Sequence, residues 1–232
     1  MTSPPLIPWT RPGVVVAFTT RAGGVSTGPY ASLNLGGKGD DPARVEENRG
    51  RACAALGLDP ARLAINRQRH TPTVHRAHSG ARGEPGDGLW SDEPELPMLA
   101  LTADCVPIAI ARDGARPALA VLHAGWRGLA EGVVAAGVAA VGRGPKAAII
   151  GPAAGPCCYE VGPEVAQLFD SDLTTRGILN LWAAAERALL RAGVEDVERV
   201  DLCTRCNPDL FFSHRRDGPR RGTQGLVGAV AA

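Results

Sequence analysis

The stretch from residue 99 to residue 128 limits the possible folds of this chain more than any other part of it. Two apolar runs, 106–111 and 118–122, flank a turn-like segment that contains Asp113 and Gly114. A strand, an Asp-Gly turn and a second strand predict a β-hairpin. Folding the chain about this turn pairs Cys105 with position 122 or with His123. Directly opposed residues have Cβ atoms about 4.5–5.5 Å apart, so we expect a thiol beside an imidazole.

A thiolate next to an imidazole suits zinc, which binds sulfur at about 2.3 Å and nitrogen at about 2.0 Å. His70 follows a short apolar run at 63–65, so all three candidate ligands (His70, Cys105 and His123) lie at ends of predicted strands. Three protein ligands with an open fourth position describe a catalytic zinc site. The alternatives are a hydrogen-bonded core histidine, an inert buried cysteine, or a metal-free nucleophilic pair of Cys105 with a histidine.

The remaining cysteines give a weaker signal. Cys203-x-x-Cys206 has the spacing of a redox or metal-binding pair. The other half of a four-cysteine zinc site would have to come from Cys157 and Cys158, which are adjacent and awkward as joint ligands of one ion. We therefore predict plain buried or rim thiols at these positions.

Hydrophobic periodicity and turn residues predict interleaved helices and strands. Strands are expected at 13–19, 146–150 and 197–202, and an exposed loop at 80–88. Helices are expected from the Asp41-Pro42 cap to residue 56, and at 128–141, 163–169 and 178–192. With at least one hairpin, this pattern predicts an α+β fold: one domain over residues 1–232, with a mixed β-sheet flanked by helices.

Composition excludes several classes of protein. The formal net charge is +1 and aromatic residues are 4% of the 232 residues, so nothing indicates nucleic-acid binding. No apolar run approaches the ~18 residues of a membrane helix. The N-terminal residues lack the basic start and apolar core of a signal peptide, which predicts a cytoplasmic protein with reduced thiols. The oligomeric state, monomer or weak dimer, is left open.

Several short motifs occur in a fixed order along the chain. They are Thr20-Arg21-Ala22-Gly23-Gly24-Val25-Ser26, Ser32-Leu33-Asn34-Leu35-Gly36, Gln68-x-His70, Thr102-Ala103-Asp104-Cys105-x-Pro107, His123-Ala124-Gly125-Trp126-Arg127-Gly128, Gly151-Pro152, Cys157-Cys158-Tyr159-Glu160-Val161-Gly162 and Phe211-Phe212-Ser213-His214-Arg215-Arg216. In these motifs the chain resembles the YfiH/laccase-domain (FAMIN-like) family, from about residue 19 to residue 230.

The resemblance implies a purine nucleoside enzyme with a YfiH-like fold. It implies a zinc ion on His70, Cys105 and His123, and nucleoside and phosphate as small-molecule partners. The reactions it implies are phosphorolysis of adenosine, inosine and methylthioadenosine, and deamination of adenosine. Zinc lowers the pKa of bound water to near 7, which suits deamination. Older descriptions of the family as polyphenol oxidases or laccases imply copper, and the role of some members in peptidoglycan editing implies a cysteine-type hydrolase.

Within this resemblance, Cys105, His70 and Asp104 are the expected catalytic residues. Asp104, next to Cys105, would orient a ligand or carry a proton, unless it is a buried capping aspartate. The expected substrate and phosphate contacts are Arg21, Arg127 and Trp126, because guanidinium groups bind phosphate in a bidentate manner and an indole stacks on a purine.

One motif departs from the family pattern. The family usually closes with Thr-Gly-Arg-Gln, whereas this chain has Arg221-Gly222-Thr223-Gln224. If the family arginine binds substrate or phosphate, the charge has to come here from Arg221 or Arg220. Copper oxidation is disfavoured because multicopper oxidases need repeated His-x-His motifs, and this sequence contains none.

Overall fold

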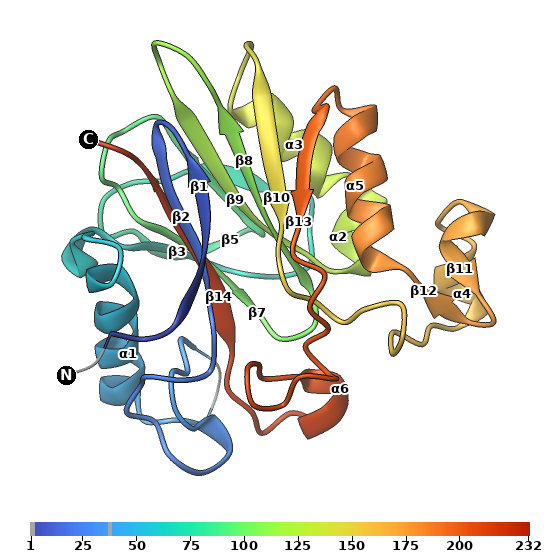
Figure 1. The fold of residues 1–232 in the computed structure, drawn as a ribbon, viewed down its shortest axis with the longest axis horizontal. Helices are drawn as coiled ribbons and strands as arrows, with labels where there is room; N and C mark the ends of the chain where they lie inside the picture. Colours follow the sequence, from blue (N-terminus) through green and yellow to red (C-terminus); the bar gives the residue numbers. More distant parts are fainter. Residues whose placement is uncertain (1–2, 37–38) are drawn as a thin grey trace.

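Two six-stranded sheets are stacked face to face, and helices cover their outer faces (Figure 1). The structure, a computed structural model, describes residues 3–36 and 39–232. The first sheet has the order β1 (Leu6–Arg11), β2 (Val14–Thr19), β14 (Gln224–Val230), β7 (Met98–Thr102), β3 (Ala64–Arg67) and β5 (Arg82–Pro85). The second has the order β13 (Asp196–Arg199), β10 (Lys146–Ile150), β8 (Val106–Arg112), β9 (Ala118–Ala124), β6 (Gly88–Ser91) and β4 (Val74–Arg76).

Both sheets mix parallel and antiparallel neighbours. The pairs β8–β9 and β2–β14 are antiparallel, whereas β10–β13 and β3–β7 are parallel. The α+β prediction is therefore confirmed, but the strands form two large sheets rather than one. A two-stranded ribbon of β11 (Thr174–Thr175) and β12 (Ile178–Leu179) lies apart from them, beside α4 (Pro163–Ala166) (Figure 1).

The second sheet is buried on both faces. In β8, Ile108 and Ile110 pack toward the helices, whereas Ala109 and Ala111 pack toward the first sheet. Successive side chains of a strand point to opposite faces, so a strand between two cores needs an unbroken apolar run. This explains the continuous apolar character of 106–111 and 118–122.

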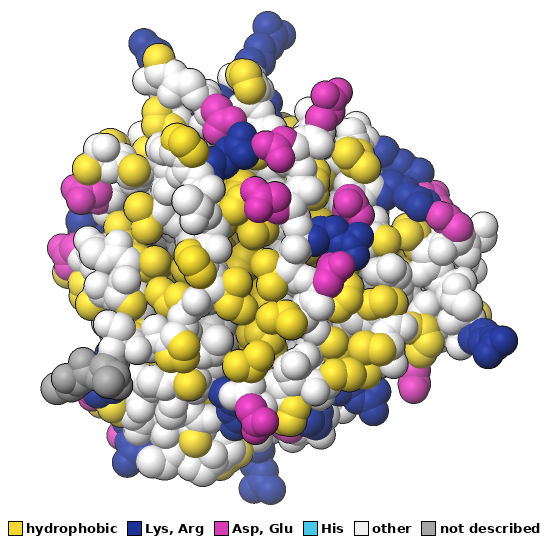
Figure 2. Space-filling model, in the orientation of Figure 1, with side chains coloured by type: hydrophobic (Ala, Val, Ile, Leu, Met, Phe, Trp, Pro, Cys, Tyr) yellow, Lys and Arg dark blue, Asp and Glu magenta, His cyan; other side chains and the backbone are white. Residues whose placement is uncertain are grey.

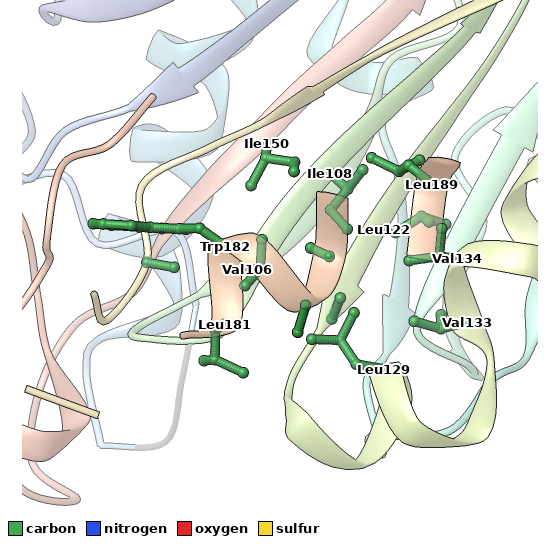
Figure 3. Close-up of a cluster of buried hydrophobic side chains, with 14 of the residues drawn as sticks. Val106, Ile108, Leu122, Leu129, Val133, Val134, Ile150, Leu181, Trp182 and Leu189 are labelled. Carbon is green, nitrogen blue, oxygen red and sulfur yellow. The ribbon is translucent and has the colours of Figure 1, made fainter. Parts of the chain in front are cut away.

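Helices complete the outer layers. Figure 3 shows Leu189 of α5 (Leu181–Arg191) beside Ile108 and Leu122 of the sheet, and Leu181 and Trp182 belong to the same buried cluster. The helices α2 (Trp126–Glu131) and α3 (Val133–Ala140) contribute to the same core. On the opposite side of the molecule, α1 (Pro42–Ala54) packs against the first sheet (Figure 1).

The predicted helices exist, but their boundaries differ. Asp41 caps α1 as expected, because its side chain accepts the Ala43 N–H. The helix predicted at 128–141 is broken at Gly132, whose φ of 93° ends α2 and precedes α3. Residues 178 and 179 belong to β12 instead of α5. Other boundaries differ as well: α1 ends at Ala54, α4 spans Pro163–Ala166, and β13 covers Asp196–Arg199.

The distribution of charged side chains on the surface agrees with the formal net charge of +1. Acidic and basic side chains lie next to one another around the apolar centre of the face in Figure 2, with no large field of one sign. Among the described residues, no helix combines the length and the apolar character needed to cross a membrane. The short 3₁₀ turns Gly28–Tyr30, Pro60–Arg62 and Ser171–Leu173, and the helix α6 (His214–Asp217), complete the secondary structure.

Candidate metal centre and active site

Three separate segments bring His70, Cys105 and His123 together. His70 follows β3, Cys105 lies between β7 and β8, and His123 is the next-to-last residue of β9. Their ligand atoms all lie within 4.8 Å of one another. The Cys105 Sγ is 3.8 Å from His70 Nε2, and the two imidazole rings meet edge to face with centroids 4.8 Å apart.

The hairpin register differs from the prediction. His123 pairs with Pro107, so Cys105 lies just before the first residue of β8 rather than opposite position 122 or 123. The reason is the turn: Arg112 pairs with Ala118, which leaves a loop centred near Ala115 instead of Asp113-Gly114. The thiol still reaches the imidazole because it projects from the loop at the end of the same hairpin.

A buried aspartate that the sequence analysis missed organises two of these ligands. Asp87 Oδ1 is 2.8 Å from His123 Nδ1, which fixes the ring so that Nε2 is available to bind a ligand. The same carboxylate accepts the backbone N–H groups of Arg69, His70 and Thr71 at 2.8–2.9 Å. One side chain therefore holds both the His70 loop and the His123 ring.

The sequence predicts an exposed loop at residue 87, because Pro-Gly-Asp-Gly is a typical turn sequence. The first part of that stretch is exposed as predicted, but residues 82–85 form the edge strand β5 rather than a loop. Asp87, however, is only 2% exposed, and β6 begins immediately after it. The apolar Leu89-Trp90 that follows was the available signal that the chain re-enters the core at this point.

The electrostatics of the group favour an ion pair. Burial opposes ionisation of Cys105, but the nearby imidazoles of His123 and His70 outweigh it and lower the thiol pKa to about 6. Burial also opposes a charged His123, yet the Cys105 thiolate and Asp87 raise the pKa of that imidazole to about 9. Burial likewise opposes the Asp87 carboxylate, but the hydrogen bonds from His123, Thr71 and Arg69 hold its pKa well below the ordinary range.

The backbone is strained at this group. His70 and Asp104 have φ values of 61° and 91°, two of the four positive values among non-glycine residues in the described chain. Such conformations cost about 1–3 kcal/mol each and cluster at functional sites. Gly125 is required for a different reason: a Cβ there would lie 2.8 Å from the His70 ring and 3.0 Å from Cys105 Sγ.

A cavity of about 780 Å³ opens onto the three ligands. This volume lies within the range of small-molecule sites. Its wall carries His214 and the guanidinium-bearing residues Arg67, Arg69 and Arg221. Arg221 Nε is buried without a hydrogen-bond partner in the described residues. A buried, unsatisfied guanidinium N–H is costly, and an anion bound in the cavity would satisfy it.

Asp104 lies beside the ligand group in sequence, but its side chain points elsewhere. Its Oδ1 accepts the Thr204 hydroxyl at 2.6 Å, and its Oδ2 accepts the Arg215 backbone N–H at 2.7 Å. These contacts match the alternative of a buried capping aspartate. The residue ties the start of α6 to the loop that carries Cys105.

The other predicted binding residues do not line this cavity. Arg21 donates to the carbonyl oxygens of Ala31 and Pro208 and stacks on Phe212, so its donors serve to hold loops together. Arg127 is exposed and lies over the ring of Trp126, which packs against the helix-side core. The structure thus gathers the ligands His70, Cys105 and His123, but not Arg21, Trp126 and Arg127, at the cavity.

Comparison with known proteins gives consistent matches over nearly the whole chain. A sequence model of the family described as "Multi-copper polyphenol oxidoreductase laccase" matches residues 15–230. The Escherichia coli (strain K12) protein named purine nucleoside phosphorylase YfiH is 37% identical over 228 residues, which cover 90% of this chain and 91% of that protein. The chain belongs to the YfiH/laccase-domain family.

Further members agree with this assignment. A protein of Xylella fastidiosa (strain 9a5c) named purine nucleoside phosphorylase is 40% identical over 233 residues, or 89% of this chain and 88% of that protein. The crystal structure of a Neisseria meningitidis protein superimposes with a TM-score of 0.89 at 33% identity and covers 100% of both chains. The YfiH-like fold inferred from the motifs is therefore confirmed.

In this member of the YfiH/laccase-domain family, two groups of described residues could hold a metal ion. One is His70, Cys105 and His123, and the other contains only cysteines: Cys157, Cys158, Cys203 and Cys206. The first has the mixed nitrogen and sulfur donors that zinc accepts and leaves one side open to the cavity. Its donor set and geometry thus fit a single metal ion of the zinc type.

Proposed function

We propose that this chain is a zinc-dependent purine nucleoside phosphorylase. The observation that carries the proposal is the joint placement of the three ligands and of Arg221 on one 780 Å³ cavity. The relatives named purine nucleoside phosphorylase, at 37% and 40% identity over about nine tenths of the chain, support the reaction class. The proposed partners are accordingly a nucleoside and phosphate.

Zinc is the proposed metal rather than copper. The family description names several coppers, but in the described residues only one candidate group contains histidine. Two imidazoles and one thiolate match the ligand types of catalytic zinc sites. A zinc ion held by His70, Cys105 and His123 would supply Lewis acidity at the cavity wall.

The residues of the chain itself would bind and orient the reactants. In phosphorolysis, a phosphate oxygen forms a bond to the anomeric carbon of the sugar while the bond from that carbon to the purine nitrogen breaks. Arg221 and Arg69 line the cavity, and their guanidinium groups would hold the phosphate dianion in place. We assign this task to them rather than to Arg21 or Arg127.

The side chains of His70, Cys105 and His123 must also be held in fixed positions to act together. Asp87 fixes the His123 ring through Nδ1 and the His70 loop through three backbone N–H groups. Gly125 lets the His70 ring and the Cys105 sulfur approach the backbone closely. Because these side chains are already held in position, they need not rearrange during the reaction. The finer proposal extends to adenosine, inosine and methylthioadenosine as phosphorolysis substrates, and to deamination of adenosine.

The test is direct turnover. Zinc-loaded protein is incubated with adenosine, with and without phosphate, and the products are separated beside those of Cys105→Ala. Adenine and ribose 1-phosphate that form only with phosphate and vanish in the variant would support phosphorolysis. Inosine formed without phosphate would support deamination. If the metal-replete protein turns over none of the three nucleosides, the proposal is wrong.

One observation favours a second candidate function. The neighbouring imidazoles lower the Cys105 thiol pKa to about 6, which is also the signature of a Cys-His nucleophile. A metal-free protein that cleaves a peptidoglycan precursor through Cys105 would show this alternative. Activity that survives removal of zinc separates it from the leading proposal.

A further inference from the structure

A second group of sulfur atoms lies outside the cavity described above. Cys157 and Cys158 follow β10, and Cys203 and Cys206 follow β13. Because β10 and β13 are parallel neighbours, the loops that follow them leave the sheet at the same end, and they then continue toward α4 and α6 respectively (Figure 1). A bridge between Ala153 and Cys203 keeps these loops in register.

The four sulfur atoms converge. All lie within 4.8 Å of one another, with Cys206 Sγ 3.6 Å from Cys157 Sγ and 3.1 Å from Cys158 Sγ. A tetrahedral zinc ion with bonds of about 2.3 Å places its sulfur ligands roughly 3.8 Å apart. The sequence predicts plain buried or rim thiols, and the four cysteines are free; the structure adds that the loops bring adjacent cysteines from one segment against a Cys-x-x-Cys turn from another.

We propose that Cys157, Cys158, Cys203 and Cys206 bind one zinc ion as a closed structural site. Four sulfur donors with no open side are the ligand set of structural zinc, and softer thiolate ligands select this metal over magnesium or calcium. This inference is independent of the nucleoside activity, because it concerns different residues and a different role.

The backbone around the cluster is built to support thiolates. Gly155 donates its N–H to Cys203 Sγ at 3.3 Å, the type of hydrogen bond that stabilises a metal-bound sulfur. Asn207 closes the Cys-x-x-Cys turn, because both its backbone N–H and its side-chain amide donate to the Cys203 carbonyl. Arg205 donates to the Cys158 carbonyl and so places a positive charge beside a site whose four thiolates exceed the charge of the ion.

A disulfide is the competing outcome of this arrangement. Two of the thiols, those of Cys158 and Cys206, are near enough for oxidation to join them with a small movement. A disulfide would leave Cys157 and the hydrogen-bonded, buried Cys203 without a role. A four-sulfur site uses all of them, which is why we favour zinc.

The cluster would hold the wall of the active site in place. Thr204, between two of the proposed ligands, donates its hydroxyl to Asp104 Oδ1 at 2.6 Å. Arg216 of α6 donates to the Thr204 carbonyl at 3.0 Å, and Asp104 Oδ2 accepts the N–H of Arg215. A metal ion that ties the two loops together therefore also fixes α6, which starts at the cavity residue His214.

Metal content in a background that lacks the first site tests the proposal. Full-length Cys105→Ala, purified reduced and without chelator, is loaded with zinc, desalted and measured for zinc per chain. We expect one ion, and none after Cys203→Ser and Cys206→Ser are added. Cys53→Ala in the same background is the matched control, since Cys53 is a core cysteine that belongs to neither group, and it should retain one ion. Cobalt should give the visible spectrum of tetrahedral thiolate coordination.

The serine variants could fail to fold, so the decisive measurement uses Cys105→Ala, in which all four cysteines of the cluster are intact. No zinc in folded, reduced Cys105→Ala, or a cobalt spectrum without thiolate charge-transfer bands, would overturn the proposal. Loss of two hydrogen atoms in the intact mass of metal-free protein, with Cys158 and Cys206 linked in a peptide map, would assign the cluster to a disulfide instead. Nucleoside turnover does not enter either outcome.

Discussion

The two sulfur-containing groups of this molecule differ in their donor atoms and in their access to the large cavity. His70, Cys105 and His123 supply mixed donors and open onto a cavity of about 780 Å³. The four-cysteine group supplies sulfur alone and lines none of that cavity. Catalytic zinc sites keep one position open, whereas structural sites are closed by four protein ligands.

The supports behind the two groups differ as well. Behind the first lies the carboxylate of Asp87, which orients an imidazole and a loop. Behind the second lie backbone groups, such as the Gly155 N–H, and no carboxylate is bonded to its sulfur atoms in the described chain. A charged carboxylate next to a ligand tunes its reactivity, whereas hydrogen bonds from backbone N–H groups hold a thiolate in place and stabilise its charge. The comparison therefore predicts that damage to the first group removes activity and damage to the second removes stability.

The largest expected effect contrasts one ligand from each group. Cys105→Ala should lower kcat/KM for adenosine phosphorolysis by about 10³-fold or more, since it removes several kcal/mol of transition-state stabilisation. Cys206→Ser should instead lower the Tm by about 5–10 °C and leave kcat within roughly tenfold of the parent. Steady-state kinetics and calorimetry on both variants check this. The comparison fails if the two variants lose activity and stability in the same proportion.

The less exposed thiol of Cys105 should react faster than the more exposed thiol of Cys157. In reduced, metal-free protein at pH 7, Cys105, with a pKa lowered to about 6, is mostly thiolate. Burial raises the pKa of Cys157 to about 11, so it is almost fully protonated although it is more exposed. After allowance for the lower nucleophilicity of a low-pKa thiolate, Cys105 should react with iodoacetamide roughly 50-fold faster.

The pKa values of the two thiols also determine how their labelling rates change with pH. Labelling of Cys105 should be half-maximal near pH 6 and level above pH 7, while labelling of Cys157 should still rise past pH 9. Peptide mass spectrometry after short exposure measures each site. Faster labelling of Cys157 at pH 7 would show that exposure, not the imidazole neighbours, governs the thiols.

The two buried aspartates sharpen the comparison further. Asp87→Asn should weaken zinc binding and kcat/KM by about 10- to 100-fold, because the amide no longer carries the charge that orients His123. Asp104→Asn keeps the size of the side chain, and its contacts lie with Thr204 and Arg215 rather than with a ligand. It should change the Tm more than the zinc affinity, which a competitive chelator titration measures. Equal losses of zinc affinity in both would contradict the separate roles.

These aspartates also show what sequence patterns can and cannot reveal. The strand ends placed His70, Cys105 and His123 in one site, because continuous apolar runs predict buried strands well. Its position next to Cys105 predicts a catalytic role for Asp104. Its left-handed backbone, however, turns its side chain toward α6. Asp87 was overlooked because its contacts join residues 16 to 36 positions away, and no local pattern reports such contacts.

The same limit explains the four cysteines and the sheets. Whether Cys157 and Cys158 meet Cys203 and Cys206 depends on β10 and β13 being parallel neighbours, a tertiary fact. The division into two sheets depends likewise on long-range pairing of β14 with β2 and β7. Element types and the β8–β9 hairpin could be predicted from periodicity and turn residues. The pairing of strands far apart in the sequence, and the four-cysteine group that depends on it, could not.

The last comparison tests which arginine serves the open site. Arg221 lines the cavity and has a buried Nε without a partner in the described residues, whereas Arg127 is exposed on Trp126. A charge-assisted hydrogen bond contributes about 1.5–3 kcal/mol, so Arg221→Gln should raise the KM for phosphate about 10- to 100-fold. Arg127→Gln should change it less than about twofold.

Exposed Arg220 supplies the matched control, since Arg220→Gln removes the same charge one residue away from the cavity position. Initial rates at varied phosphate, with adenosine saturating, give the KM for each variant. An increase confined to Arg221→Gln would mean that this chain delivers the anion-binding charge from position 221, two residues before the usual family position. An increase in Arg127→Gln alone would instead place phosphate at the start of α2.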